Sequence, residues 1–320
     1  MTTLVLAGLN GSSPLGFLAA VGLLRIVANR DPAVRLAFLD DGTFRPLLSD
    51  GWPSDRSVGA GDAPPAWATP RALADLVAGD AAALRRGQRP WFLTYEKVER
   101  RGVKVVADLK APPAVFIRFL RDAVAQWADG CDEAAVYAAA FGTSVAVDGK
   151  GNTKPTAFHF TAANQQFLGA IDSIGERVDS EWTMASLFEG HAARPGANVR
   201  WDPSAERNYA LMANDPNTEG TQVDAPLEWL AFRGLPLFPT VPRGNRAVTT
   251  GVTGRGETMT FHWPLWSAAA SVMAVRSLLA LPWAEGATGH ASRGVFACCG
   301  SAIRRSGQGF GSFSPSVLMP

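Results

Sequence analysis

A membrane-spanning helix needs about 20 consecutive apolar residues, and this chain of 320 residues contains no run approaching that length. The longest apolar stretch, residues 14–27, is interrupted by Arg25 and by glycines, so we expect it to form a buried helix. The N-terminus, Met-Thr-Thr-Leu-Val-Leu, has no basic region of the kind that opens a secretory signal. We therefore expect a cytoplasmic protein with no membrane segment.

Cysteine and histidine are also scarce. The three cysteines and four histidines form neither a Cys-x-x-Cys pair nor the spacing of a metal site. The chain contains no phosphate-binding G-x-x-x-x-G-K-[ST] loop, no G-x-S-x-G nucleophile motif and no H-E-x-x-H motif. We accordingly expect a protein that is not an enzyme, with no catalytic residue, no bound metal and no cofactor.

What the chain does contain is typical of a globular protein, with 47% apolar and 18% charged residues. Turn signals between β-branched runs predict an α+β fold, in which mixed or antiparallel sheets are built from hairpins and hydrophobic helices pack between them. Gly16 and Gly22 should let other backbones approach the first helix closely. The segments that we expect are a strand at 2–7, hairpins at 34–48, 91–108 and 246–263, and helices at 14–27, 69–84, 113–128, 132–140, 163–178 and 264–280, with a further helix ending at residue 234.

Domain organisation is open to two interpretations. One divides the chain into an N-terminal α+β domain, 1–148, which carries a basic hairpin, and a C-terminal α+β domain, 149–320. The other treats the whole chain as one continuous domain.

Charge is segregated along the sequence although the net charge is only +1. Lys and Arg dominate residues 85–121 and 233–320, whereas Asp and Glu dominate 122–149 and 155–232. Such a pattern suits a protein that binds a polyanion on one face. The alternative is that the blocks interleave in space and cancel.

Cations concentrate at the predicted hairpin tips, in a glycine loop at 149–154 and near the C-terminus. There they could contact phosphates, while the amides of Asn152, Asn245 and Gln308 could reach base edges. Aromatic side chains that could stack on bases are Trp91, Tyr95, Phe261 and Trp263. The predicted DNA-binding residues are Lys97, Arg100, Arg101, Lys104, Lys110, Lys150, Asn152, Lys154, Arg243, Arg246, Arg255, Arg304 and Arg305.

Two other functions remain open. Glu96 and Asp108 could face each other across the first basic hairpin, and with Lys110 they could form a metal-dependent nuclease site. Alternatively, the chain is a protein-interaction scaffold in which the acidic block 155–232 binds a basic partner and no nucleic acid is contacted.

Three segments, 9–25, 154–168 and 229–239, resemble the large-subunit proteins of type I CRISPR effector complexes (Cascade), and most closely those of type I-G, formerly I-U. They read LNGSSPLGFLAAVGLLR, KPTAFHFTAANQQFL and WLAFRGLPLFP. At 320 residues the chain is short for such a subunit, which implies that a C-terminal helical bundle or a small subunit is supplied elsewhere.

The resemblance implies a non-catalytic subunit of an RNA-guided surveillance complex. Such a subunit binds target double-stranded DNA, reads the protospacer-adjacent motif and helps stabilise the R-loop. Its partners would be the crRNA-bearing filament subunits of Cascade and the helicase-nuclease Cas3. The family has no fixed motif-reading pattern, so Asn152 as the base reader is an expectation from the residues.

Overall fold

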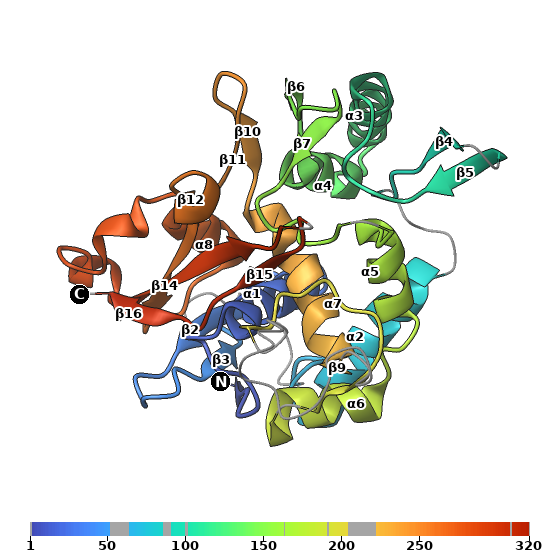
Figure 1. The fold of residues 1–320 in the computed structure, drawn as a ribbon. Helices are drawn as coiled ribbons and strands as arrows, with labels where there is room; N and C mark the ends of the chain where they lie inside the picture. Colours follow the sequence, from blue (N-terminus) through green and yellow to red (C-terminus); the bar gives the residue numbers. More distant parts are fainter. Residues whose placement is uncertain are drawn as a thin grey trace.

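The computed structural model describes residues 2–51, 64–85, 91–99, 102–162, 164–190, 192–203, 222–307 and 309–319. Within these ranges the chain forms helices and several small antiparallel sheets, which confirms the predicted α+β class. Helices α1 (Pro14–Ala28) and α7 (Ala225–Gly234) occupy the centre of the molecule, the largest sheet lies to one side, and three two-stranded hairpins lie along the upper part of Figure 1.

Four of the predicted helices match observed helices closely. The α-helices are α1 (Pro14–Ala28), α2 (Pro70–Arg85), α3 (Pro113–Ala128), α4 (Glu133–Phe141), α5 (Phe167–Gly175), α6 (Ser180–Met184), α7 (Ala225–Gly234) and α8 (Val272–Leu279). The shorter helical turns are η2 (Ala185–Glu189), η5 (Leu235–Leu237), η6 (Gly256–Thr258), η7 (Trp283–Glu285) and η8 (Ala291–Arg293). The helix expected over 163–178 is shorter than predicted, because α5 begins only at Phe167.

All the strand pairings are antiparallel in the described ranges. One sheet has the order β1-β3-β2, with strands β1 (Thr3–Val5), β2 (Arg35–Phe38) and β3 (Pro46–Ser49). The largest sheet has the order β12-β13-β14-β15, with β16 also pairing with β14, and its strands are β12 (Val252–Thr253), β13 (Thr260–Trp266), β14 (Val295–Arg305), β15 (Gly311–Phe313) and β16 (Val317–Met319). The two-stranded sheets pair β4 (Tyr95–Glu99) with β5 (Gly102–Val106), β6 (Gly142–Val147) with β7 (Thr153–Pro155), β8 (Arg194–Pro195) with β9 (Gln222–Val223), and β10 (Thr240–Pro242) with β11 (Ala247–Thr249).

Helix α1 is the centre of the core. It is buried on nearly all sides, as its uniformly apolar sequence predicts. It packs against α7 with the two backbones in contact, since a β-carbon at Gly22 would lie 1.8 Å from the carbonyl oxygen of Leu230. Gly16 is equally confined, because a β-carbon there would lie 2.2 Å from the carbonyl oxygen of Asn10. The prediction that these glycines permit close approach is therefore confirmed.

The helix predicted over 264–280 is wrong in its first half. Strand β13 continues through Pro264 to Trp266, and α8 begins only after Ser271, whose side chain caps it. Strand β12 pairs only with the start of β13, so at Pro264 only β14 pairs with this strand. Proline, which has no backbone N–H to donate, is tolerated at such an edge position.

The hairpin predicted over 246–263 is also differently paired. Strand β11 pairs with the preceding strand, β10, and β12 pairs with the following strand, β13. Two successive hairpins therefore replace the single one expected, and the first of them carries Arg243 and Arg246 at its tip.

The boundary suggested at residues 148 and 149 falls in the turn between β6 and β7, which pair with each other. Buried side chains from Leu6 to Phe313 belong to one continuous hydrophobic cluster, and α1 of the first half packs on α7 of the second. Within the part of the chain that the structure describes, no helix combines the length and apolarity that crossing a bilayer requires.

Candidate nucleic-acid interface

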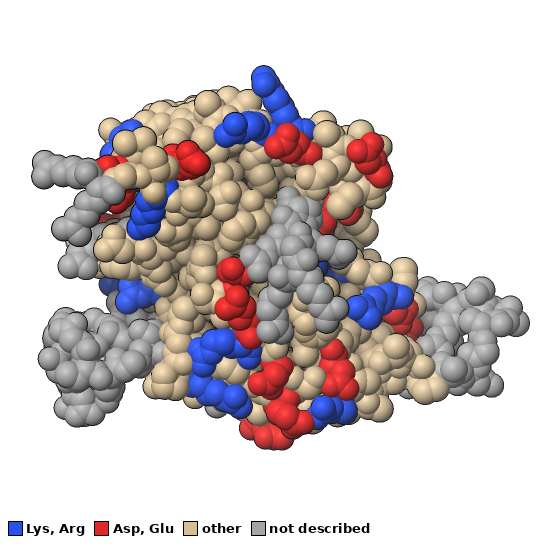
Figure 2. Space-filling model, turned by 90° about the vertical axis from the view of Figure 1, so that its right-hand side faces the viewer, with Lys and Arg blue, Asp and Glu red and all other residues tan. Residues whose placement is uncertain are grey.

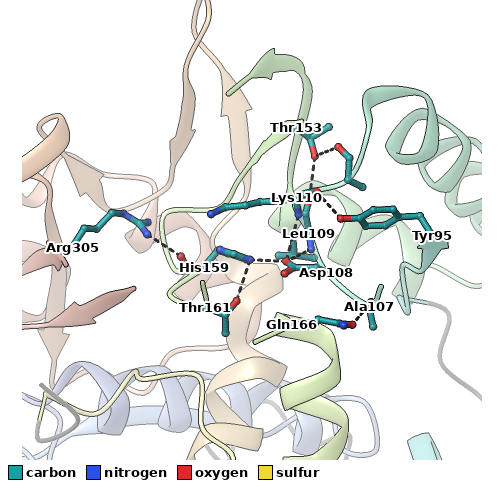
Figure 3. A network of polar contacts seen from close by, with 11 residues as sticks. Tyr95, Ala107, Asp108, Leu109, Lys110, Thr153, His159, Thr161, Gln166 and Arg305 are labelled. Atoms are coloured by element: carbon teal, nitrogen blue, oxygen red, sulfur yellow. Dashed lines mark hydrogen bonds and ion pairs between the residues drawn. The ribbon is translucent and has the colours of Figure 1, made fainter. Parts of the chain in front are cut away.

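The short segment Ala107–Ala111, which joins β5 to α3, is held from several directions (Figure 3). The side-chain oxygen of Gln166 accepts the Ala107 N–H at 2.6 Å. The Thr153 hydroxyl lies 3.0 Å from the Leu109 carbonyl oxygen and 2.9 Å from that of Ala111. On the other side, the Tyr95 hydroxyl donates to the Lys110 carbonyl oxygen at 2.9 Å. The backbone that carries Asp108 and Lys110 is therefore fixed in position.

Asp108 and His159 form the central link of this site. The His159 Nε2 lies 2.6 Å from Asp108 Oδ1, and the Thr161 hydroxyl oxygen lies 3.2 Å from the same nitrogen. The Leu109 N–H also donates to Asp108 Oδ1, at 2.6 Å. His159 is only 1% exposed. This link fastens the 107–111 segment to the residues that follow β7, although nothing in the sequence spacing of Asp108 and His159 indicates that they meet.

The protonation states follow from burial and from the hydrogen bond. Burial lowers the pKa of the His159 imidazole more than the Asp108 hydrogen bond raises it, so the ring is neutral near pH 7 and its Nε2–H donates to the carboxylate. Burial raises the pKa of Asp108, but the His159 hydrogen bond and two backbone amides outweigh it and hold the pKa below the ordinary value. Asp108 is therefore ionised near pH 7, and its carboxylate accepts hydrogen bonds from His159 and from the backbone.

Mild acid is expected to destabilise the protein through His159. Because the pKa of His159 is lower in the folded protein than in the unfolded chain, the unfolded chain binds more protons below about pH 6.5, and stability falls as the pH drops through that value. The free energy of unfolding by urea, measured at neutral and at mildly acidic pH, should fall less in His159→Gln than in the wild type. His262, whose pKa burial also lowers, is present in both proteins and forms the common background. An equal fall in the two proteins would show that another group titrates.

Three of the predicted DNA-binding cations are brought together around this link, and we refer to Lys110, Lys150 and Arg305 as the cation cluster. Burial, then Arg305, and to a smaller extent Lys150 lower the pKa of the Lys110 ammonium, while Asp108 and Asp148 oppose the shift. The Arg305 guanidinium donates to the carbonyl oxygens of His159 at 3.2 Å and of Ala157 at 3.3 Å. Figure 3 shows the Lys110 and Arg305 side chains extending toward each other beside His159.

The loop that carries Lys150 is a tight turn between β6 and β7. Asp148 Oδ1 accepts the N–H groups of Lys150 at 2.8 Å and Asn152 at 3.0 Å, and Gly151 adopts the left-handed conformation with φ of 77°. The Lys150 side chain is exposed and that of Asn152 is half-buried. The turn therefore presents both residues on a rigid support.

Lys154 and Asn245 brace two hairpins against each other. The Lys154 ammonium donates to the Asn245 carbonyl oxygen at 2.7 Å, and the Asn245 side-chain oxygen accepts the Val147 N–H at 3.2 Å. The tip of β10–β11 is thereby held beside β6–β7, which adds Arg243 and Arg246 to the same end of the molecule (Figure 1). Arg243 is exposed, whereas Arg246 donates to the Gly254 carbonyl oxygen at 3.2 Å.

The basic hairpin β4–β5 has two unlike faces. Lys97 lies directly opposite Lys104 in the register, and its ammonium is 3.1 Å from a Glu99 carboxylate oxygen. The other face is apolar and strongly exposed, with Val98 at 83%, Val103 at 62% and Val105 at 63%. Arg100 and Arg101, predicted as part of this site, lie outside the described residues, as does Gln308.

Arg255 and Arg304 are not members of the cluster, although Arg304 is next to Arg305 on β14. Arg255 is exposed at the end of β12, and Arg304 Nε donates to the Ser314 hydroxyl oxygen at 2.7 Å. The proposed base-stacking residues Trp91, Phe261 and Trp263 are at most 1% exposed and belong to the hydrophobic core, so they cannot stack on bases in this structure. Phe261 and Trp263 instead fill the space between the largest sheet and α1, and Trp91 packs on Tyr137 of α4 and Phe232 of α7.

The geometry does not assemble the proposed nuclease site. Glu96 lies opposite Val105 in the hairpin register, and Asp108 is committed to His159 and to the backbone. Among the residues that the structure describes, no group of three or more His, Cys, Asp or Glu side chains is placed to hold a metal ion.

No protein-family model and no curated protein matches this chain. The resemblance to CRISPR large subunits therefore stays a prediction. Figure 2 shows one face of the molecule, on which Lys and Arg side chains are interspersed with Asp and Glu. On that face, positive and negative side chains alternate, which agrees with the alternative that the charge blocks of the sequence interleave in space.

A pocket of about 1050 Å³ lies on a different part of the molecule, between α1, α4 and α8. The buried guanidinium groups of Arg25 and Arg233 line it, but both pair with Glu133. Because Glu133 neutralises part of the arginine charge, we expect the pocket to attract an anionic ligand less strongly than the cation cluster does.

Proposed function

We propose that this chain is a non-catalytic, nucleic-acid-binding subunit of a cytoplasmic type I CRISPR RNA-guided complex. It would bind target double-stranded DNA, read the protospacer-adjacent motif and help stabilise the R-loop. The observation that carries the nucleic-acid part of the proposal is the cation cluster of Lys110, Lys150 and Arg305. The assignment to a CRISPR complex is supported by the sequence resemblance alone.

The cluster suits a phosphate because nearby positive charge and burial outweigh the Asp108 and Asp148 carboxylates at Lys110, whose pKa is lowered. No ion pair joins any of the three to a carboxylate within the described ranges, since Asp108 accepts from His159 and Asp148 caps its own turn. Three like charges close together repel one another until an anion binds between them. The backbone at each of the three positions is already hydrogen-bonded, by the Tyr95 hydroxyl, by the Asp148 carboxylate and by pairing with β15, so a phosphate would bind without ordering a loop.

The other predicted residues take complementary roles in this proposal. Lys97 and Lys104, on one face of β4–β5, would follow the duplex backbone, and the exposed Arg243 would extend the same contact from the β10–β11 tip. Asn152, on the Asp148 turn beside Lys150, would read a base edge. The crRNA-bearing filament and Cas3 would bind elsewhere on the surface.

The salt dependence of DNA binding tests the cluster. The double variant Lys110→Gln/Lys150→Gln should bind a fluorescein-labelled duplex more weakly, and the slope of log affinity against log salt concentration should become shallower by about 2, since each lost phosphate contact removes about 0.9. The measurement is fluorescence anisotropy over a series of salt concentrations.

A matched control for this experiment removes the same amount of charge elsewhere. Arg30→Gln/Arg276→Gln changes two exposed arginines, one in the turn after α1 and one on α8, and it should leave the slope close to that of the wild type. If the cluster variant kept the wild-type slope, or if the control variant lost as much, the cluster would not be the phosphate-binding site.

A further inference from the structure

Helix α3 carries an exposed apolar stripe that no other part of the described chain covers. Its exposed members are Ile117 at 38%, Val124 at 58% and Trp127 at 62%, with the partly buried Leu120 between them. Their spacing of three, four and three residues is that of the a and d positions of a coiled-coil seam. Solvent-exposed helix faces are normally polar, so a seam of this kind is typical of a helix that packs against another helix.

The inward side of α3 is already occupied. Phe116 and Ala123 are buried, at 1% exposure each, where α3 packs on α4 and β6. The stripe lies next to this buried side, so a second helix laid along it would extend an existing helix layer. Figure 1 places α3 at the periphery of the molecule.

The charges along the stripe specify the chemistry of the partner. Arg118 and Arg121 are both exposed, and within the described ranges neither forms an ion pair with a carboxylate. If Ile117 and Val124 are a positions, Arg121 is an e position, which in coiled coils faces charged side chains of the other helix. Asp122 points to the opposite side of α3, since it is five residues from Ile117 and two from Val124.

We propose that α3 docks an amphipathic helix of another protein, with large aliphatic residues at 3,4 spacing and Glu or Asp along the edge that meets Arg118 and Arg121. This inference concerns a different surface from the cation cluster and does not depend on the proposed nucleic-acid function. The exposed indole of Trp127 would supply the main apolar anchor, because aromatic side chains dominate the energy of such contacts.

Two synthetic peptides of about three heptads provide a direct test. Both carry Leu at a and d, and one carries Glu at e and g whereas the other carries Lys. Repulsion between like charges keeps each peptide from pairing with itself. Fluorescence anisotropy of the labelled Glu peptide with the full chain should show binding about tenfold tighter than that of the Lys peptide. Binding of neither peptide, or equal binding of both, would overturn the proposal.

Variants of the chain locate the contact. Trp127→Ala should weaken binding of the Glu peptide at least about tenfold, and Arg121→Glu should reverse the preference between the peptides. Both positions are exposed, so folding should be preserved. Val145→Thr, at a valine on β6 that is 68% exposed, is the control and should not change binding of either peptide.

If Trp127→Ala instead abolished self-association of the chain in analytical ultracentrifugation, the occupant would be a second copy and the proposed hetero-partner would be wrong. Duplex DNA affinity should be the same in Trp127→Ala and the wild type, and a loss there would also overturn it.

Discussion

Gly22→Ala is expected to lower the free energy of unfolding by about 3 kcal/mol or more. The added methyl group would lie 1.8 Å from the Leu230 carbonyl oxygen and 2.8 Å from the Gly234 backbone nitrogen, and both neighbours are backbone atoms that cannot rotate away. Helices α1 and α7 would therefore have to separate. The separation would open the centre of the core, where α1 is buried on nearly all sides. Urea unfolding followed by circular dichroism measures the effect.

Gly79→Ala is the matched control. Gly79 lies on the exposed side of α2, and a β-carbon there would meet nothing within 4 Å. Alanine is favoured over glycine inside a helix, so this substitution should raise stability by about 0.5–1 kcal/mol. If the two variants changed stability by similar amounts, the close contact between α1 and α7 would not limit the packing of the core.

The features that could be predicted from the sequence are those that local patterns determine. The apolar run at 14–27 has no polar face, which means that α1 must be buried, and its glycines indicate where another backbone comes close. The turn residues around Asp148 and Gly151 similarly predict the loop that presents Lys150. In these places local preference and tertiary structure agree.

The sequence-based predictions fail where contacts between residues far apart in the chain determine the structure. Pro264 carries a strong signal for a helix start, yet Trp263 and Trp266 are both needed in the core, and the strand that contains them pairs with β14. The Asp108–His159 link joins residues 51 positions apart that share no motif. The cation cluster depends on that link and on Arg305 from the C-terminal sheet, so its three members could be named from the sequence but not placed together.

Glu133→Gln is expected to destabilise the protein by about 3–5 kcal/mol, because it leaves the buried Arg25 without a counter-charge and removes one of the two carboxylates that face Arg233. The Glu133 carboxylate pairs with both Arg25 and Arg233, whose side chains are only 11% and 5% exposed. Arg233 also contacts Asp80, with Nε 3.1 Å from a carboxylate oxygen, and it donates to the Tyr137 hydroxyl at 2.9 Å. Burial raises the pKa of Glu133, but the two guanidinium groups outweigh it and hold the pKa below the ordinary value, so glutamine cannot replace the charge.

A double-mutant cycle separates the pair from the rest of the network. Arg25→Gln alone should also be destabilising, but the double variant Glu133→Gln/Arg25→Gln should be more stable than the sum of the two losses predicts, because it retains Arg233 with Asp80 as a balanced pair. Glu257→Gln, an exposed carboxylate on η6, is the control and should change the free energy of unfolding by less than about 0.5 kcal/mol. Strictly additive losses would mean that Arg25 and Glu133 are not energetically coupled, although both line the 1050 Å³ pocket.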